Sequence, residues 1–209
     1  MKVYQPELIV ITKPENSTNE TYQIIEMFQK GLAVLHLRKP TLSEDETIEF
    51  LNTIPEQYHE RIVIHQHYKC INTYNLKGIH FPEAIRKDSS LMQGYLNYFG
   101  DKGISISTSF HSPEALLGKQ EAIFQYAFLG PVFNSISKPG YNGKFFNIHK
   151  ELLPFPVYAI GGITPEHISK IPKMGFSGVA ALGYIWNNPN PVKAFEQLSN
   201  YKNYFSKPL

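Results

Sequence analysis

Short runs of apolar and β-branched residues recur at a nearly even spacing along the chain. Eight such runs are present, at residues 8–12, 33–37, 61–65, 78–81, 103–107, 126–130, 156–162 and 178–183. Their length and their content of Val, Ile and aromatic residues are typical of buried β-strands. The pattern therefore predicts eight short strands.

Helical spacing fills most of the intervals between these runs. Residues 21–31 end in a glycine typical of a helix C-cap, residues 43–52 open with Ser43 and Glu46 as a capping box, and residues 165–175 begin with a proline. The connections at 70–77 and 147–153 are short for a full helix. Strands that alternate with helices predict a parallel sheet, and eight units in one chain predict a single-domain (β/α)8 TIM barrel over residues 1–209. A doubly wound sheet is the alternative, but it usually has fewer strands.

Composition agrees with a globular protein and narrows the partners. The chain has 209 residues, of which 42% are hydrophobic, and 20 basic residues oppose 18 acidic ones without a polybasic run. We therefore expect neither nucleic acid nor a membrane as partner, whereas an assembly of identical chains stays open. The single Cys70 cannot form an internal disulfide, and no apolar run approaches the ~20 residues of a membrane span. These features favour a cytoplasmic protein.

The barrel prediction directs attention to the residues that follow each strand, because such barrels carry their active sites at the carboxyl ends of the strands. These residues are rich in hydroxyls, imidazoles and cations but poor in acids, which suits an anionic ligand. They are Thr12, Lys13, His36, Arg38, Lys39, His65, Gln66, His67, His80, Glu83, Ser105, Ser107, Ser109, Asn134, Ser135, Ser137, Lys138, Gly161, Gly162, Leu182 and Gly183.

The segment AIGGITPEH, residues 159–167, is the strongest local signal. Gly161 and Gly162 follow a strand, and Thr164 and Pro165 open a helix, so backbone N–H groups are accessible near a helix start. Gly183 ends the next strand, and the last two strand ends of such barrels often bind phosphate. The segment predicts a phosphate site; the alternative is that the glycines only form tight turns.

The segment FLGPVFNSISKPGYNG, residues 128–143, is a second candidate. Ser135, Ser137 and Lys138 lie on a loop that Pro139 makes rigid and that Gly140 and Gly143 leave flexible, so it can fold over an anionic ligand as a lid. A solvated surface loop is an equally good interpretation.

The segment LHLRKP, residues 35–40, places basic side chains at a strand end. Arg38 can hold a phosphate or carboxylate with its forked guanidinium, or it can form a surface salt bridge. His36 and Arg38 share a face because side chains alternate along a strand.

Histidines follow three consecutive strands, at His36, His65 and His80, with His67 two residues further on. Three convergent imidazoles can bind zinc, but their spacing matches no known zinc motif. Hydrogen-bonding histidines are the favoured interpretation. No nucleophile elbow, GxGxxG motif or P-loop is present.

Four of these segments, in their order and spacing, give the chain a family resemblance. GISISTSFHSPEAL, FLGPVFNSISKPG, AIGGITPEH and GVAALGYI resemble thiamine-phosphate synthases and the related thiazole tautomerases, and the likeness extends upstream through LHLRKP and GIHF. The resemblance implies a (β/α)8 transferase of thiamine biosynthesis. Such an enzyme joins an aminopyrimidine diphosphate to a hydroxyethylthiazole phosphate with Mg²⁺ and releases pyrophosphate.

The resemblance also implies roles for individual residues. The thiazole phosphate is expected on Gly161, Gly162, Leu182 and Gly183. The pyrophosphate is expected on Arg38, Ser135, Ser137 and Lys138, with help from Lys39 and Ser107, whereas His36, His65 and Gln66 fall on the pyrimidine side.

The chain departs from the family where the metal is bound. The family has Asn-Asp after the third strand, and this chain has His65 and Gln66; a second acidic ligand is expected near Ile85, where only Glu83 is close. Mg²⁺ prefers oxygen ligands with carboxylate charge. The tautomerases have a histidine at the position of Pro131. These departures leave open a catalytically weak or inactive paralogue that binds a thiazole phosphate or a related ligand.

Overall fold

Eight parallel strands close into one barrel, as the sequence predicts. The computed structural model describes residues 8–117, 123–134, 142–144, 146–149 and 153–200. Each strand pairs with the next along the chain, and the last pairs with the first, so the order in the ring equals the order in the sequence. The strands are β1 (Leu8–Ile11), β2 (Val34–Leu37), β3 (Ile62–Ile64), β4 (Gly78–Phe81), β5 (Ser105–Phe110), β6 (Tyr126–Leu129), β7 (Val157–Ile160) and β8 (Gly178–Ala181).

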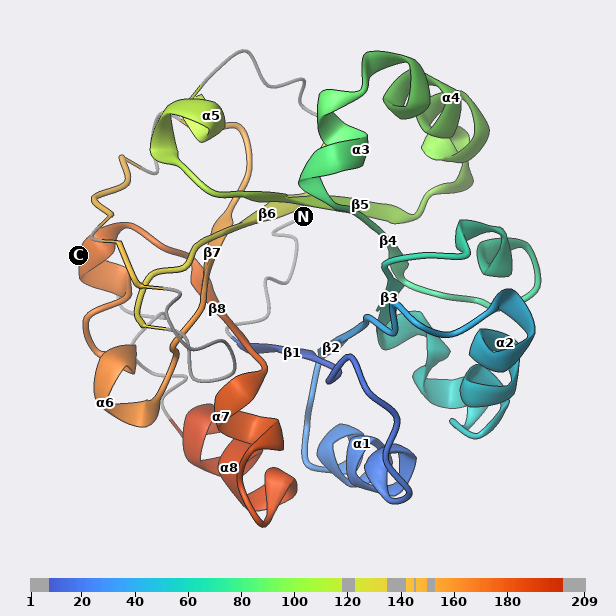
Figure 1. The fold of residues 1–209 in the computed structure, drawn as a ribbon, viewed down its shortest axis with the longest axis horizontal. Coiled ribbons are helices and arrows are strands. Elements are labelled where there is room, and N and C mark those ends of the chain that lie inside the picture. The colour runs from blue at the N-terminus through green and yellow to red at the C-terminus, as the bar shows by residue number, and fades with distance from the viewer. Residues whose placement is uncertain (1–7, 118–122, 135–141, 145, 150–152, 201–209) are drawn as a thin grey trace.

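The helices lie outside this ring of strands (Figure 1). None of the helices in the described ranges is long and apolar enough to cross a membrane. They are α1 (Glu20–Gln29), α2 (Glu44–Asn52), α3 (Glu83–Lys87), α4 (Ser89–Phe99), α5 (Pro113–Leu117), α6 (Pro165–Ile168), α7 (Gly183–Trp186) and α8 (Pro191–Ser199), with 3-10 turns at Glu56–Arg61, Tyr68–Asn72, Gly100–Lys102 and Pro172–Met174.

The predicted helix ends are right for residues 21–31, where Gly31 with a φ of 95° follows the C-cap Lys30, and for residues 43–52, but wrong for a third segment. Ser43 and Glu46 form the expected capping box at the start of α2. The single helix expected over 165–175 is instead the short α6 followed by a 3-10 turn. Pro172 explains the break, because it has no N–H to donate and its ring clashes with the carbonyl four residues earlier in a continuous α-helix.

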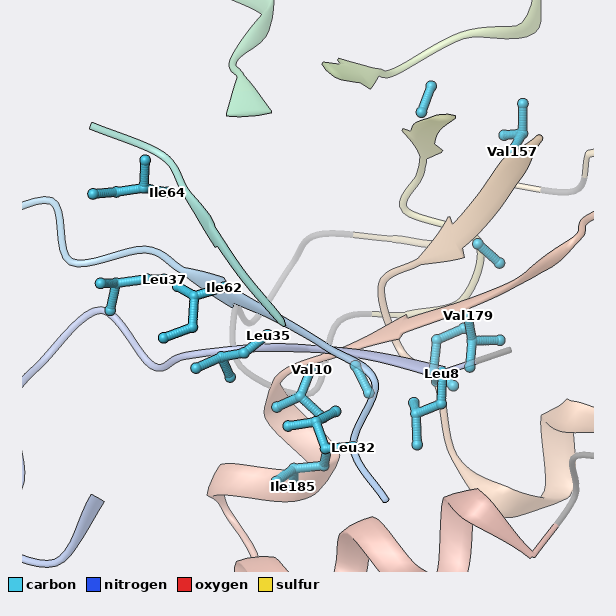
Figure 2. Packing of buried hydrophobic residues seen from close by; sticks show 14 of the residues in the cluster. Leu8, Val10, Leu32, Leu35, Leu37, Ile62, Ile64, Val157, Val179 and Ile185 are labelled. Atoms are coloured by element: carbon cyan, nitrogen blue, oxygen red, sulfur yellow. The ribbon is translucent and has the colours of Figure 1, made fainter. Parts of the chain in front are cut away.

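Strand side chains alternate between two cores. Leu8 and Val10 of β1 point outward and pack with residues from the helices, whereas Ile9 and Ile11 point into the barrel. Figure 2 shows the outer core, where Val10 lies beside Leu32 and Ile185. Because both faces of every strand are covered, burial and the ring of hydrogen bonds both favour the closed barrel.

The barrel interior is apolar on one side and polar on the other. Strands β1 and β8 contribute aliphatic side chains such as Ile9 and Ala180. Strands β2, β4 and β5 contribute His36, His80 and Ser107, all of which are buried. Interiors of such barrels are usually filled with branched apolar residues, so a buried polar wall is unusual.

Gly78 allows β4 and β5 to approach closely below this polar wall. A Cβ atom at Gly78 would lie 1.9 Å from the carbonyl oxygen of Ser105, whereas one at Gly94 in α4 would meet nothing within 4 Å. We predict that Gly78→Ala lowers the free energy of unfolding by about 1 to 3 kcal/mol through overpacking. Gly94→Ala, the matched control, raises it by about 0.5 to 1 kcal/mol through helix propensity. Urea unfolding followed by circular dichroism measures both, and equal effects would contradict the close strand contact.

Candidate functional site

Three histidines from consecutive strands meet inside the mouth of the barrel. His36 lies on β2, His65 follows β3 and His80 lies on β4. One ring nitrogen from each lies within 4.8 Å of the other two. His36 Nδ1 is 2.9 Å from His65 Nε2, and the rings of His65 and His80 are stacked with centroids 4.2 Å apart. The sequence spacing alone did not show that these nitrogens converge. We call these three residues the histidine cluster.

Hydroxyl groups from β5 and β6 lie within hydrogen-bonding distance of ring nitrogens of His36 and His80. The Tyr126 hydroxyl lies 2.7 Å from His36 Nε2. The two ring nitrogens of His80 lie 2.9 Å from Ser107 Oγ and 2.8 Å from Ser109 Oγ. The orientation of His80 is thus fixed by two hydroxyls on the neighbouring strand β5, and that of His36 by a hydroxyl from β6, which is not a neighbour of β2 in the ring.

Burial keeps the histidine cluster uncharged. Desolvation lowers the pKa of His36 and of His65 well below the usual histidine value, and the neighbouring imidazoles lower both further. Desolvation, and then the Arg38 charge, lower the pKa of His80 to about 3. At neutral pH the cluster therefore offers imidazole lone pairs and N–H donors rather than positive charge.

Arg38 supplies the positive charge next to the cluster. Its guanidinium is close enough to lower the pKa of both His65 and His80. Thr12 holds the backbone of Arg38, because its hydroxyl accepts from the Arg38 N–H at 2.8 Å and lies 3.1 Å from the Arg38 carbonyl. The expectation that His36 and Arg38 approach the same side of the mouth agrees with this arrangement.

Lys39 is not available at the mouth, contrary to the expectation that it helps to bind pyrophosphate. Its ammonium is only 1% exposed and forms a buried ion pair with Glu20 of α1, and it also donates to the Glu15 carbonyl at 2.9 Å. Burial lowers the pKa of Lys39 and raises that of Glu20, against the mutual attraction of the pair. Lys39 therefore fastens the β2–α2 loop to α1.

Ser107 and His36 also lie deeper than a ligand at the mouth would reach. Both are fully buried, and Ser107 is bonded to His80. Ser109, two residues further along β5, is only half-buried and lies nearer the open end. His65 and Gln66 are half-buried at the end of β3, and the Gln66 amide donates to the Lys39 carbonyl. Of the predicted pyrimidine-side residues, His65 is the one whose ring is both accessible and part of the cluster.

The glycine turn after β7 has the backbone geometry of a tight anion-accepting loop. Gly161 and Gly162 have φ values of 95° and 65°, which favour glycine. The Gly162 carbonyl lies 2.9 Å from His167 Nδ1, and the His167 ring stacks on Phe133. No acceptor among the described residues is bonded to the N–H of Gly161 or Gly162. As far as the described part of the chain extends, the turn therefore offers two N–H donors to another partner.

A further glycine, Gly183, follows the end of the next strand, β8. Leu182 is the N-cap of α7 and Gly183 its first residue, directly after β8. The β7 and β8 ends are neighbours in the ring, with Ile160 paired to Ala180. The four residues expected to bind a phosphate thus belong to two adjacent strand ends.

The lid prediction falls on residues that the structure does not describe. Ser135, Ser137 and Lys138 lie outside the described residues. The flanking positions are described: Asn134 Oδ1 accepts from the Gly143 N–H at 2.9 Å, so the two ends of the segment lie together.

The described residues at the mouth do not form a magnesium site. Strand β3 ends in an imidazole and an amide, and the Glu83 carboxylate is ion-paired with Arg86 and Lys87 at 3.4 and 3.0 Å and lies 3.7 Å from His111 Nε2. These neighbours, led by Lys87, lower the pKa of Glu83. Magnesium requires an oxygen-rich ligand set with carboxylate charge, so these residues do not fit the ion.

A cavity of about 700 Å³ lies beside the glycine turn. It is rich in lysine and shares His167 with that turn, but none of the cluster histidines lines it. The lining residues are Val132, Phe133, Asn134, Gly143, Lys144, His167, Lys170, Lys173 and Met174. Positive charge therefore gathers beside the glycine turn as well as at Arg38.

Two partners of the site were missed by sequence reasoning. Glu20 looks like the first acidic residue of an exposed helix, and only the barrel brings it to Lys39. Tyr126 opens β6, and its inward direction follows from the alternation of strand side chains. Tyr126 shares a strand face with Phe128 and Gly130, so the alternation could have predicted that Tyr126 points into the barrel. Nothing in the sequence indicates that Glu20 meets Lys39.

The fold and site define a (β/α)8 barrel with glycine turns at the β7 and β8 ends and a neutral histidine cluster at the β2 to β4 ends. A family model described as thiamine monophosphate synthase matches residues 8–185. The chain therefore belongs to the thiamine monophosphate synthase family.

Individual relatives agree with this assignment. The chain is 24% identical over 184 residues to the putative thiamine-phosphate synthase 2 of Aquifex aeolicus, covering 85% of this chain and 96% of that protein. A thiamine phosphate pyrophosphorylase from Bacteroides thetaiotaomicron superimposes with a TM-score of 0.73 at 28% identity, over 95% of this chain and 98% of that one. The corresponding protein from Pyrococcus furiosus superimposes with a TM-score of 0.77 at 18% identity, over 96% and 97%, which supports the fold.

The buried Glu20–Lys39 pair gives a stability prediction. Glu20→Gln leaves the Lys39 ammonium buried without a counter-charge and lowers the free energy of unfolding by about 3 to 5 kcal/mol. Glu196→Gln is the control, because it breaks an exposed ion pair with Lys30 and changes stability little. Urea unfolding of both variants measures the difference. Similar small effects in both would mean that Lys39 is solvated and free to meet a ligand.

Proposed function

We propose that this protein is a thiamine-phosphate synthase that joins an aminopyrimidine diphosphate to a hydroxyethylthiazole phosphate in thiamine biosynthesis. The family supports the reaction class, and the thiamine-phosphate synthase names of its relatives support the substrates. The single structural observation that carries the proposal is the pair of N–H donors at Gly161 and Gly162, beside the β8 end, which no acceptor in the described ranges engages. Such donors suit a phosphate group.

In this proposal the thiazole phosphate binds to the backbone of the two glycine turns. Gly161 and Gly162 donate their N–H groups from β7, and Leu182 and Gly183 approach from β8. A side chain at Gly161 would come within 2.7 Å of Pro131, so only glycine leaves the turn in its present shape. The phosphate fixes one reactant, and with it the direction of the thiazole nitrogen.

The pyrophosphate end of the other substrate meets Arg38. Its guanidinium can bind two phosphate oxygens at once, and the neighbouring neutral imidazoles do not add competing charge. Ser135, Ser137 and Lys138 are its further proposed partners. During the reaction the bond between the pyrimidine methylene carbon and the pyrophosphate oxygen breaks, and the thiazole nitrogen bonds to that carbon. The electron pair leaves with pyrophosphate, where fixed positive charge stabilises it.

The half-buried His65 and Gln66 serve the pyrimidine. His65 is neutral, so its ring can donate or accept a hydrogen bond at the polar edge of the pyrimidine. His36 lies behind His65 at 2.9 Å and acts by orienting it. The reaction needs placement of charge more than a general base, which agrees with a site poor in carboxylates.

A second candidate is a family member that binds a phosphorylated thiazole or a related ligand without turnover. The observation that favours it is the lack of an oxygen ligand set for Mg²⁺ at the ends of β3 and β4, together with the burial of Lys39. Under this alternative, the glycine turns keep their ligand while the leaving pyrophosphate is not stabilised.

Release of pyrophosphate from the two substrates, with Mg²⁺ in the buffer, tests the proposal. We expect turnover by the unmodified protein. Arg38→Gln should lower kcat/KM about 100-fold, because it removes one positive charge that stabilises the departing pyrophosphate. Arg61→Gln is the matched control: Arg61 precedes β3 at the opposite end of the barrel and packs on Tyr58. Micromolar binding of the thiazole phosphate without any turnover would overturn the synthase and leave the second candidate.

Gln66→Asp separates the two candidates further. The substitution restores a carboxylate at the end of β3, where the family has an acidic ligand. In a synthase with weak metal binding we expect a rise in Mg²⁺-dependent turnover, measured as the rate against Mg²⁺ concentration. Gln66→Glu places the same charge one methylene further out and should give a smaller rise. An unchanged rate in both variants would favour the binding protein.

A further inference from the structure

We propose that His36, His65 and His80 form a binding site for one divalent transition-metal ion of the zinc type. The proposal rests on the geometry of the cluster and not on the synthase reaction, although both proposals use His65 and His36. Three histidine nitrogens with an open fourth position are a ligand set that zinc uses in proteins. The ligand atoms here already lie within 4.8 Å of one another before any ion is bound.

The distances between the rings are close to those of a metal site. Two imidazoles on one tetrahedral zinc ion have nitrogens about 3.3 Å and ring centres about 5.2 Å apart, given zinc–nitrogen bonds of about 2.0 to 2.1 Å. His36 Nδ1 and His65 Nε2 are 2.9 Å apart. The ring centres of His36 lie 5.1 Å from His65 and 5.3 Å from His80. His65 and His80, stacked at 4.2 Å, have to separate by about 1 Å and turn their nitrogens toward the ion, because ligand nitrogens now within 4.8 Å of one another must approach about 3.3 Å.

The hydrogen-bond partners suit a ligating role. A histidine that binds a metal usually donates its other N–H to a neighbouring acceptor, which fixes its tautomer. His36 can bind through Nδ1 while Nε2–H donates to the Tyr126 hydroxyl at 2.7 Å. His80 can bind through one nitrogen and donate from the other to Ser107 or Ser109. The ion then takes the place of the proton between His36 and His65.

The surroundings select the type of metal. Imidazoles are borderline ligands that favour Zn²⁺, Co²⁺ or Ni²⁺, and Mg²⁺ is disfavoured because no carboxylate belongs to the cluster. Phe128 covers one side, with its ring 5.0 Å from that of His80 and 4.8 Å from that of His36. Arg38 opposes any cation here, and the half-buried His65 leaves the way in from the mouth. The expected ion is thus held by neutral nitrogens, with the Phe128 ring on one side and hydroxyl groups behind His36 and His80.

Metal binding to the full chain tests this site. Metal-free protein is dialysed against Zn²⁺ or Mg²⁺ and the bound metal is measured by elemental analysis, with affinity from calorimetry. We expect one zinc per chain and no magnesium at equal concentration. Cobalt in place of zinc should give the visible absorption of a four- or five-coordinate ion.

Three variants connect the metal to the cluster. His65→Gln and His80→Gln should each weaken zinc binding by at least about tenfold. Tyr126→Phe keeps the aromatic packing and removes only the hydroxyl behind His36, and it should weaken binding by about 10-fold. Circular dichroism shows whether each variant folds. If His80→Gln does not fold, the variants at the half-buried His65 and at Tyr126 still test whether the cluster binds the metal.

His111→Gln is the matched control. His111 lies at the surface, 3.7 Å from Glu83. Together they form a histidine–carboxylate pair in which adventitious zinc would bind. Its loss should leave zinc affinity unchanged. Absence of stoichiometric zinc, or zinc binding that His111→Gln abolishes and His65→Gln does not, would overturn the proposal and leave the cluster as a hydrogen-bonded network.

Discussion

Closure of eight short parallel strands into one ring of hydrogen bonds is the constraint on which the other features depend. Each strand has only three to six residues, so no strand pair is stable by itself. Once the register is fixed, inward and outward side chains follow by alternation, and the carboxyl ends meet at one mouth. The histidine cluster, the glycine turns and Arg38 come together only because the ring is closed.

The polar wall inside this barrel carries a cost that apolar barrels avoid. Buried imidazoles and hydroxyls lose their hydration, and each must find a partner in the protein. The chain provides these partners across four strands, from His36 to Tyr126 and from His80 to Ser107 and Ser109. The result is a fixed and uncharged set of nitrogens. A fixed, uncharged set of nitrogens is expected in a ligand-binding site, whereas apolar side chains would fill a packing core at a lower desolvation cost.

Sequence reasoning succeeded where a local rule decides the structure. Regularly spaced apolar runs gave the barrel, the Ser43–Glu46 pair gave the start of α2, and Thr164–Pro165 gave the start of α6. It failed where a partner is distant in sequence. Lys39 follows a strand, as ligand-binding residues do in such barrels, but its ammonium forms a buried ion pair with Glu20 of the preceding helix. The helix expected over 165–175 is interrupted for a local reason, because Pro172 cannot continue an α-helix in spite of the apolar periodicity.

The sequence by itself determined the number of strands, their order and the family, because apolar periodicity and glycine-rich strand ends are local properties of the chain. It also indicated which residues follow each strand. Only the tertiary structure decided which of these residues share a site and in which charge state. Strand register brings His36, His65 and His80 to one point, burial keeps them neutral, and a helix from another part of the chain withdraws Lys39. Such effects depend on distances and on the exclusion of water, and neither is written in the spacing of residues along the chain.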